Sequence, residues 1–190
     1  MAHAPTFRFD RPDGEARLRE LILYVSARCE SDPKFGATKL NKILWWSDFL
    51  TYAYTGKPIT GVEYMRLGNG PVPRRMMAVR ESMQQAREIA VAEVDMPFGG
   101  RTQHRVMALR SPDLSKFSAE EIDVVQHVIT ALWHKTAKGV SALSHGKAWE
   151  VADDKGPIPY EAVFLSDARI DRYDIARTKA LARIHGWALA

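Results

Sequence analysis

The sequence "TKLNKILWWSDFLTYAY", residues 38–54, is the stretch on which the fold of this 190-residue chain depends. Its apolar residues do not keep to one helical face. Leu40, Ile43 and Leu44 fall on one side of a helix, whereas Trp45 and Phe49 fall on another. A helix that is apolar around much of its circumference is covered by neighbours on several sides. We therefore expect a central helix here.

Helical patterns of ordinary amphipathic type flank this segment on both sides. Gly56 and Pro58 end the central helix, since glycine permits a left-handed cap and proline cannot continue the hydrogen-bond ladder. Further helices are predicted over residues 15–30 with Asp13 as N-cap, over 76–86 entered through Pro73, over 119–133 behind a Ser118–Glu121 capping box, in two short pieces over 139–152, and over 171–186.

Two stretches do not follow the helical period. Residues 89–110 contain two short β-rich runs around a loop with two glycines, which predicts one hairpin. Residues 153–170 carry Gly-Pro and Pro punctuation and predict a long irregular loop. The expected fold class is mainly α (α+β): a compact multi-helix domain with a small β-hairpin or sheet element. We expect a single domain over residues 1–190.

The composition is that of an ordinary soluble protein, with 46% hydrophobic and 26% charged residues. No apolar run approaches the ~20 residues of a membrane span, and the first residues lack the apolar core of a secretory signal. Cys29 is the only cysteine, which excludes an internal disulfide and a multi-thiolate metal site. We expect a cytoplasmic protein without membrane contact, cofactor or metal.

The positive charge is concentrated in the middle of the chain. Residues 36–110 carry eleven Lys and Arg against six Asp and Glu, whereas the flanking segments are balanced or slightly acidic. The candidate partner-binding residues in this segment are Arg66, Arg74, Arg75 and Arg80. They could meet an acidic protein or nucleic acid, but the basic residues alternate with acidic ones and no basic recognition helix is apparent.

The turn "YMRLGNGPVPRR", residues 64–75, has two readings. Its glycines resemble the start of a dinucleotide fingerprint, yet the later glycine is missing and Pro71 removes an amide that would face a phosphate. Glycine-rich turns also serve only to redirect the chain. We expect an elbow that leads the chain from an extended segment into the next helix.

Two further patterns suggest catalytic or metal chemistry. Ser144 and Lys147 match the S-x-x-K spacing of serine acyl-enzymes without its companion motifs, so Ser144 is expected instead to cap the helix ahead of Trp149. His127 and His134, seven residues apart, share a helix face but have no partner at metal-ligand spacing. His145 is a further candidate metal ligand. No metal site is expected.

Asp48 lies in the apolar central helix, where a charge must be paired if it is buried. Lys39 and Lys42 are close to it along the chain. We expect Asp48 to form a structural ion pair or cap rather than to act as a catalytic acid.

Two separated stretches resemble the Panacea domain of SocA-like antitoxins. The first matches a pattern of K-L-x-K-L-L-[YW]-x-x-D, then G-x-P, then an aromatic residue before G-P-V, and the second lies near residues 141–160. The resemblance covers most of residues 15–170. Its positions in this sequence are Lys39, Leu40, Lys42, Asp48, Gly56, Pro58, Tyr64, Gly70, Pro71, Val72, Ser144, His145, Trp149, Ile158, Pro159 and Tyr160.

The resemblance implies a mostly helical fold without enzymatic activity, which neutralises a cognate toxin encoded nearby by direct protein–protein binding. The alternative is a basic nucleic-acid-binding regulator that uses residues 66–80.

Overall fold

The fold is mainly α with two small antiparallel sheets, as predicted, in a computed structural model that describes residues 4–95, 102–165 and 179. The helices are α1 (Gly14–Arg28), α2 (Ala37–Thr55), α3 (Met76–Gln85), α4 (Ala119–Leu132), α5 (Ala137–Leu143) and α6 (Lys147–Glu150), with 3-10 turns η1 (Leu114–Lys116) and η2 (Tyr160–Phe164). The strands are β1 (Tyr64–Met65), β2 (Val72–Pro73), β3 (Ile89–Asp95), β4 (Thr102–Ala108) and β5 (Pro157–Ile158).

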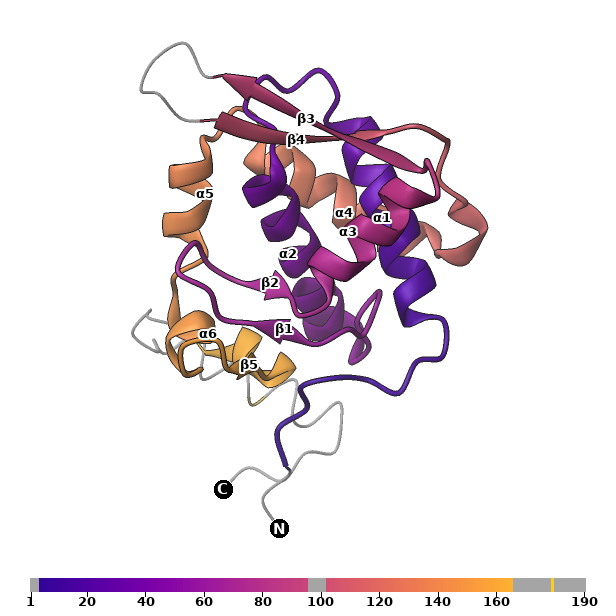
Figure 1. Cartoon of the computed structure of the whole chain (residues 1–190). Coiled ribbons are helices and arrows are strands. Elements are labelled where there is room, and N and C mark those ends of the chain that lie inside the picture. Colours follow the sequence, from indigo (N-terminus) through magenta and orange to yellow (C-terminus); the bar gives the residue numbers. More distant parts are fainter. Residues whose placement is uncertain (1–3, 96–101, 166–178, 180–190) are drawn as a thin grey trace.

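Helix α2 is the central element, as its all-round apolar pattern predicts. It contacts α1, α4 and α5 among the helices, and β2 and β4 among the strands. Figure 1 shows α2 between the β3–β4 hairpin at one end and β1 and β2 at the other. Gly56 closes it in the left-handed conformation at φ 75°, and its N–H donates to the Tyr52 carbonyl at 2.8 Å.

The helix starts are only partly as predicted. The capping box of α4 is complete: the Ser118 side chain accepts from the Glu121 amide, and the Glu121 side chain accepts from the Ser118 amide. Asp13 occupies the N-cap position of α1, but its side chain makes no cap bond and accepts instead from Arg11 Nε at 3.0 Å. Asp13 is thus the N-cap residue, as predicted, but without the side-chain hydrogen bond that is typical of this position.

Strand pairing corrects two predictions. The hairpin forms as expected, with Ile89 opposite Ala108 in its register. A second sheet has the order β2-β1-β5, in which Tyr64 lies opposite Pro73 on one side and Ile158 on the other. Pro73 thus belongs to a strand rather than to the first turn of α3. The expected long loop after residue 152 is likewise interrupted by β5 and η2.

The core has two parts. The larger joins α1, α2, α3, α4 and the hairpin through aliphatic residues such as Leu21, Ile43 and Ile129. The smaller gathers aromatic residues from α2, β1 and η2, including Phe49 and Tyr160. Because α2 contributes to both parts, it connects the helical layer to the small sheet.

Some predictions fall outside these observations. The helix predicted over 171–186 lies outside the described residues apart from Lys179, and so does the tip of the hairpin loop. The single-domain prediction stays a prediction. Among the described helices, none combines the length and apolar content that a bilayer crossing requires.

Candidate functional site

The two lysines that precede Asp48 in α2 are buried but do not pair with it. Lys39 Nζ lies 2.6 Å from Asp32 Oδ2, and both side chains are 1% exposed. Lys42 Nζ donates to the Pro71 carbonyl at 2.9 Å. The expected ion pair of Asp48 is therefore wrong, because each lysine finds its acceptor in a segment that packs on α2 from outside.

Asp48 ties α2 to the segment that leads into β1. Its Oδ1 accepts from the Thr60 amide at 2.6 Å, and its Oδ2 accepts from the Tyr64 hydroxyl at 2.8 Å and from the Thr60 hydroxyl. Burial raises the pKa of Asp48 to about 6, although these hydrogen bonds favour the carboxylate. A carboxyl group with no exposed surface and several internal donors acts as a structural crosslink.

The turn between β1 and β2 packs against α2 and α5. Gly70 has a φ of +98°, and a Cβ at this position would lie 2.6 Å from Lys42 Cε and closer still to Ser144 Oγ. The Gly70 N–H donates to the Leu67 carbonyl at 2.8 Å, and Pro71 is buried. The space in front of the turn is thus filled by side chains of the chain itself. The turn is an elbow, as expected, and not a phosphate cradle.

Aromatic motif residues complete the smaller core beside β1. The Tyr160 ring stacks on Phe49 with centroids 4.6 Å apart, and Tyr64 meets Phe49 edge-on at 5.6 Å. The Tyr160 hydroxyl donates to the Val62 carbonyl at 2.7 Å. These contacts join η2 to α2 and β1, which lie about one hundred residues earlier in the chain.

Ser144 closes α5 and does not begin α6. It is fully buried, and its Oγ donates to the Ser141 carbonyl at 2.8 Å. Gly146 holds the N-cap position of α6, so the predicted cap at Ser144 is wrong. Lys147 Nζ pairs with Glu150 at 2.7 Å. The S-x-x-K spacing therefore places a buried hydroxyl beside an exposed ion pair, an arrangement that offers no accessible nucleophile.

His145 and Trp149 form a small stack that holds the elbow. Their rings lie 4.2 Å apart, Trp149 Nε1 donates to the Leu67 carbonyl at 3.1 Å, and the Arg66 guanidinium covers the Trp149 ring at 3.9 Å. Burial, followed by the charges of Lys42 and Arg66, lowers the pKa of His145. Its Nε2 is buried without a hydrogen-bond partner among the described residues. These residues fasten residues 66–67 to α6.

The other motif residues also have packing roles. Tyr64 and Ile158 are fully buried, and Gly56 is the C-cap of α2. The remaining positions are buried or half-buried: Leu40, Pro58, Val72 and Pro159.

The remaining candidates for metal or thiol chemistry do not come together. His127 is exposed and contacts Asp123 at 3.3 Å, while His134 follows the end of α4 with φ 64°, so the two histidines do not share a helix face as predicted. Burial raises the pKa of the Cys29 thiol to about 12. Within the described part of the chain, no group of three or more His, Cys, Asp or Glu side chains could hold a metal ion.

The four candidate partner-binding arginines divide into two pairs. Arg66 is half-buried, and its Nη1 donates to the Ala152 carbonyl at 2.7 Å. Arg80 is also half-buried, and burial lowers its pKa. Arg74 and Arg75 are exposed beside the start of α3. Arg74 and Arg75 are therefore the more exposed pair at the surface.

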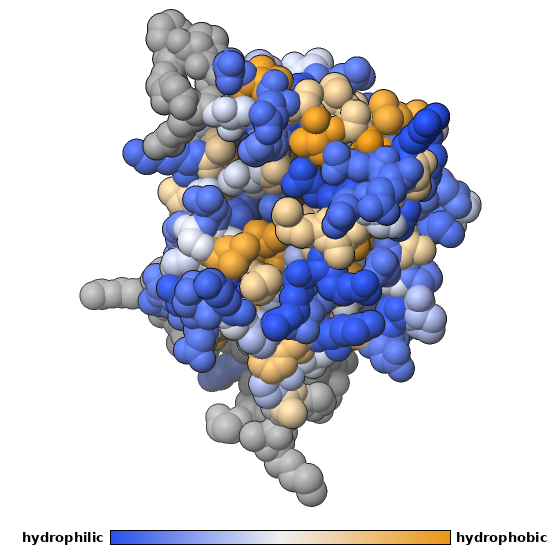
Figure 2. Space-filling model, viewed as in Figure 1, coloured by the Kyte–Doolittle hydropathy of each residue, from blue (hydrophilic) through white to orange (hydrophobic). Residues whose placement is uncertain are grey.

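Arg74 and Arg75 line a pocket of about 470 Å³ between the start of α1, the segment before β1 and the start of α3. In Figure 2, strongly hydrophilic residues cover the area beside β1, β2 and the start of α3. Sequence reasoning missed two of its arginines, since they precede α1 and no local pattern links them to residue 74. We call this site the arginine pocket, and its charged residues are Arg8, Arg11, Arg74, Arg75, Glu15 and Glu63.

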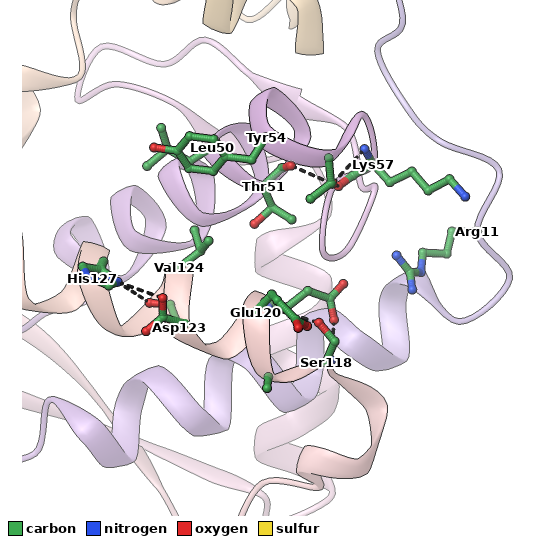
Figure 3. Close-up of a pocket in the computed structure, with 13 residues that line it drawn as sticks. Arg11, Leu50, Thr51, Tyr54, Lys57, Ser118, Glu120, Asp123, Val124 and His127 are labelled. Carbon is green, nitrogen blue, oxygen red and sulfur yellow. Dashed lines mark hydrogen bonds and ion pairs between the residues drawn. The ribbon is translucent and has the colours of Figure 1, made fainter. Parts of the chain in front are cut away.

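A second, wider groove of about 1220 Å³ lies between α2 and α4. Figure 3 shows Leu50 and Tyr54 of α2 on one side and α4 residues from Ser118 to His127 on the other. Its acidic groups already have partners in the chain. The Glu121 side chain accepts from the Ser118 amide and pairs with buried Arg17 at 2.6 Å. His127 contacts Asp123 at 3.3 Å.

Comparison with known families identifies the class of this chain. A family model described as "Antitoxin SocA-like, Panacea domain" matches residues 40–150, more than half of the chain. The chain therefore belongs to the SocA-like antitoxin family. The matched range is narrower than the expected 15–170, so Lys39, Ile158, Pro159 and Tyr160 lie outside it. Comparisons with curated proteins and with solved structures find no significant match.

Proposed function

We propose that this chain is the antitoxin of a toxin–antitoxin pair and neutralises a cognate toxin, encoded nearby, by direct protein–protein binding. The observation that carries the proposal is the family match over residues 40–150. The contacts of the motif residues support it, because they hold the elbow, the small sheet and α2 together and leave the outer surface available for a partner.

The proposed action needs no catalytic step. The hydroxyl of Ser144 and the carboxyl of Asp48 are both fully buried and engaged with the chain itself, and the Cys29 thiol is buried with a raised pKa. Nucleophiles and general acids must reach a substrate atom to act. Stoichiometric binding is therefore the simpler way for this chain to silence a toxin.

A nucleic-acid-binding regulator is the competing proposal, and the exposed pair Arg74 and Arg75 is the observation that favours it. Arg66 and Arg80 are half-buried, which reduces the basic surface on which that proposal was based. Nucleic-acid footprints are broad basic patches, whereas the exposed arginines here are gathered in one pocket together with Glu15 and Glu63, so protein binding is the better supported of the two.

The test is co-expression of the chain with the product of the adjacent gene. We expect that the product of the adjacent gene arrests growth when expressed alone, that co-expression of the chain relieves the arrest, and that the two proteins co-purify. The Asp48→Ala variant, which we expect to be strongly destabilised, serves as a control and should relieve the arrest less well than the wild type. A harmless neighbour, or relief without any complex, would contradict direct neutralisation.

A further inference from the structure

The arginine pocket collects four guanidinium groups from separate parts of the chain. Arg8 and Arg11 come from the segment before α1, and Arg74 and Arg75 from the junction of β2 and α3. Only Glu15 and Glu63 oppose them among the lining residues. The pocket is therefore a local concentration of positive charge on a chain whose overall net charge is only +4.

Three of these arginines make few contacts with the chain itself, whereas Arg11 donates to Asp13 Oδ1 and to the Pro58 carbonyl, each at 3.0 Å. Arg74 Nη1 contacts Glu63 at 2.8 Å and Arg75 Nη1 contacts Glu15 at 2.5 Å, with the two arginine side chains 51% and 70% exposed. Arg8 is exposed and has no ion-pair partner among the described residues. A guanidinium carries five N–H donors, so each of the two pairs leaves most donors available to a ligand.

The inner wall of the same pocket is apolar. Leu18 and Val79 line it and are almost fully buried, and Phe9 and Val62 beside them are half-buried. Arginines at the rim of an apolar depression are typical of the centres of protein interfaces, where an anchor side chain enters a pocket and water is excluded.

We infer that the arginine pocket is the docking site for an acidic segment of the toxin, in which Asp or Glu carboxylates flank one apolar side chain. This inference rests on the proposed function. The apolar side chain packs against the half-buried Phe9 and Val62, and the carboxylates replace Glu63 and Glu15 as partners of Arg74 and Arg75. Until then the two glutamates hold the guanidinium groups in place.

The exchange of partners is favourable for physical reasons. Exposed ion pairs contribute little to stability, so breaking the two internal pairs costs little. Carboxylates bound against an apolar wall are partly shielded from water, where their attraction to guanidinium groups is stronger. Bidentate geometry between guanidinium and carboxylate adds specificity.

A protein segment fits this site better than a nucleic acid does. Glu15 and Glu63 lie among the four arginines, so the basic surface is short and interrupted, whereas a continuous phosphate chain needs an extended row of basic partners. Arg66 and Arg80, which could have extended the basic surface, are half-buried. The charge is thus confined to one pocket with an apolar wall, whereas nucleic-acid sites extend along the backbone that they track.

The first experiment uses defined probes and does not require the toxin. The full chain is titrated by fluorescence anisotropy with a short labelled peptide of glutamate and leucine, with its glutamine–leucine counterpart, and with a single-stranded oligothymidylate. We expect the acidic peptide to bind at least about tenfold more tightly than the glutamine peptide. Preference for the oligonucleotide, or no difference between the peptides, would overturn the inference.

Charge variants assign the binding to this pocket. R74E/R75E should lower the affinity for the acidic peptide by about tenfold or more. E15Q/E63Q should raise this affinity, because the two glutamates no longer compete with the peptide for the arginines. The matched control is K135E/K138E, which makes the same charge change at exposed lysines near the start of α5. An equal loss of peptide affinity in R74E/R75E and in the control would mean that binding depends only on the net charge of the chain, and would overturn the inference.

The same variants are then titrated with the purified product of the adjacent gene. If the wild-type chain binds it and R74E/R75E binds equally well, the docking site is wrong while the proposed function stands. If the wild-type chain does not bind it, the proposed function fails and the toxin docking site fails with it. Loss of binding in R74E/R75E alone, with an unchanged circular dichroism spectrum, supports both.

Discussion

Residues 67–72 and the pair Arg74–Arg75 are neighbours in the sequence but belong to opposite kinds of surface. The elbow is packed against Lys42 and Ser144, and its backbone accepts hydrogen bonds from Lys42 and Trp149. The two arginines that follow are exposed and paired only with exposed or half-buried glutamates. The motif residues of the elbow therefore hold the fold together, and the proposed partner surface begins at Arg74, just after Val72.

The largest effect on stability is expected at Asp48. Asp48→Ala leaves the Thr60 amide and the hydroxyls of Thr60 and Tyr64 without their buried acceptor, which should cost about 3 to 5 kcal/mol in the free energy of unfolding. Urea denaturation measures this. Asp48→Asn keeps the shape and one acceptor oxygen and should cost clearly less. Equal stability of the alanine variant and the wild type would show that the crosslink is not needed.

The second largest effect on stability is expected from Gly70→Ala, which should lower the free energy of unfolding by about 2 to 4 kcal/mol. Thermal or urea unfolding measures this. The added Cβ meets Lys42 and Ser144, and the residue must keep a φ of +98°. Gly68 in the same turn is exposed, with nothing within 4 Å of a Cβ at that position. Gly68→Ala is the matched control and should change stability by less than about 1 kcal/mol. Similar losses at both glycines would refute the packed elbow.

Lys42 should make stability depend on pH. Burial lowers its pKa to about 7 from the usual 10.5, so between these values the unfolded chain binds a proton that the folded chain does not. Stability therefore rises as pH increases from 7, by at most about 1.4 kcal/mol per pH unit. The free energy of unfolding in urea is measured for the wild type and for K42M at several pH values. The difference between the two proteins at each pH isolates the contribution of Lys42, because the other titratable groups are the same in both. A difference that does not change between pH 7 and 10 contradicts a desolvated lysine.

The smallest effect on stability is expected from R74Q/R75Q. Both side chains are at least half exposed, so removal of their ion pairs should change the free energy of unfolding by less than about 1 kcal/mol. Thermal melting monitored by circular dichroism measures this. A loss as large as that of Gly70→Ala would mean that the arginines belong to the structural core and not to a partner surface.

Local patterns in the sequence were sufficient for the main helices and the hairpin, but they missed β5 and η2 and did not identify the partners of the elements. The all-round apolar pattern identified α2, the spacing of Ser118 and Glu121 identified the start of α4, and Gly56 marked the end of α2. Each of these signals lies within a few residues of the feature that it predicts. The β-rich runs of the hairpin are local in the same sense, because their strands are adjacent in the chain.

Most of the errors concern which residues come into contact, although the predicted cap at Ser144 is a local error. Lys39 pairs with Asp32 rather than with Asp48, and β5 pairs with β1 across more than ninety residues. The sequence suggested Arg74 and Arg75 for the candidate site, but Arg8 reaches the same pocket through the segment before α1, where the Phe9 amide donates to the Gly61 carbonyl at 3.0 Å. Tertiary packing decides such pairings, and periodicity carries no information about them.

Isothermal titration of the purified, folded chain with the purified product of the adjacent gene tests the central claim most directly. The account predicts saturable binding by the wild type and strong weakening in R74E/R75E, with the melting temperature of that variant close to that of the wild type. Growth rescue by the chain without any binding heat or complex in the titration would contradict it.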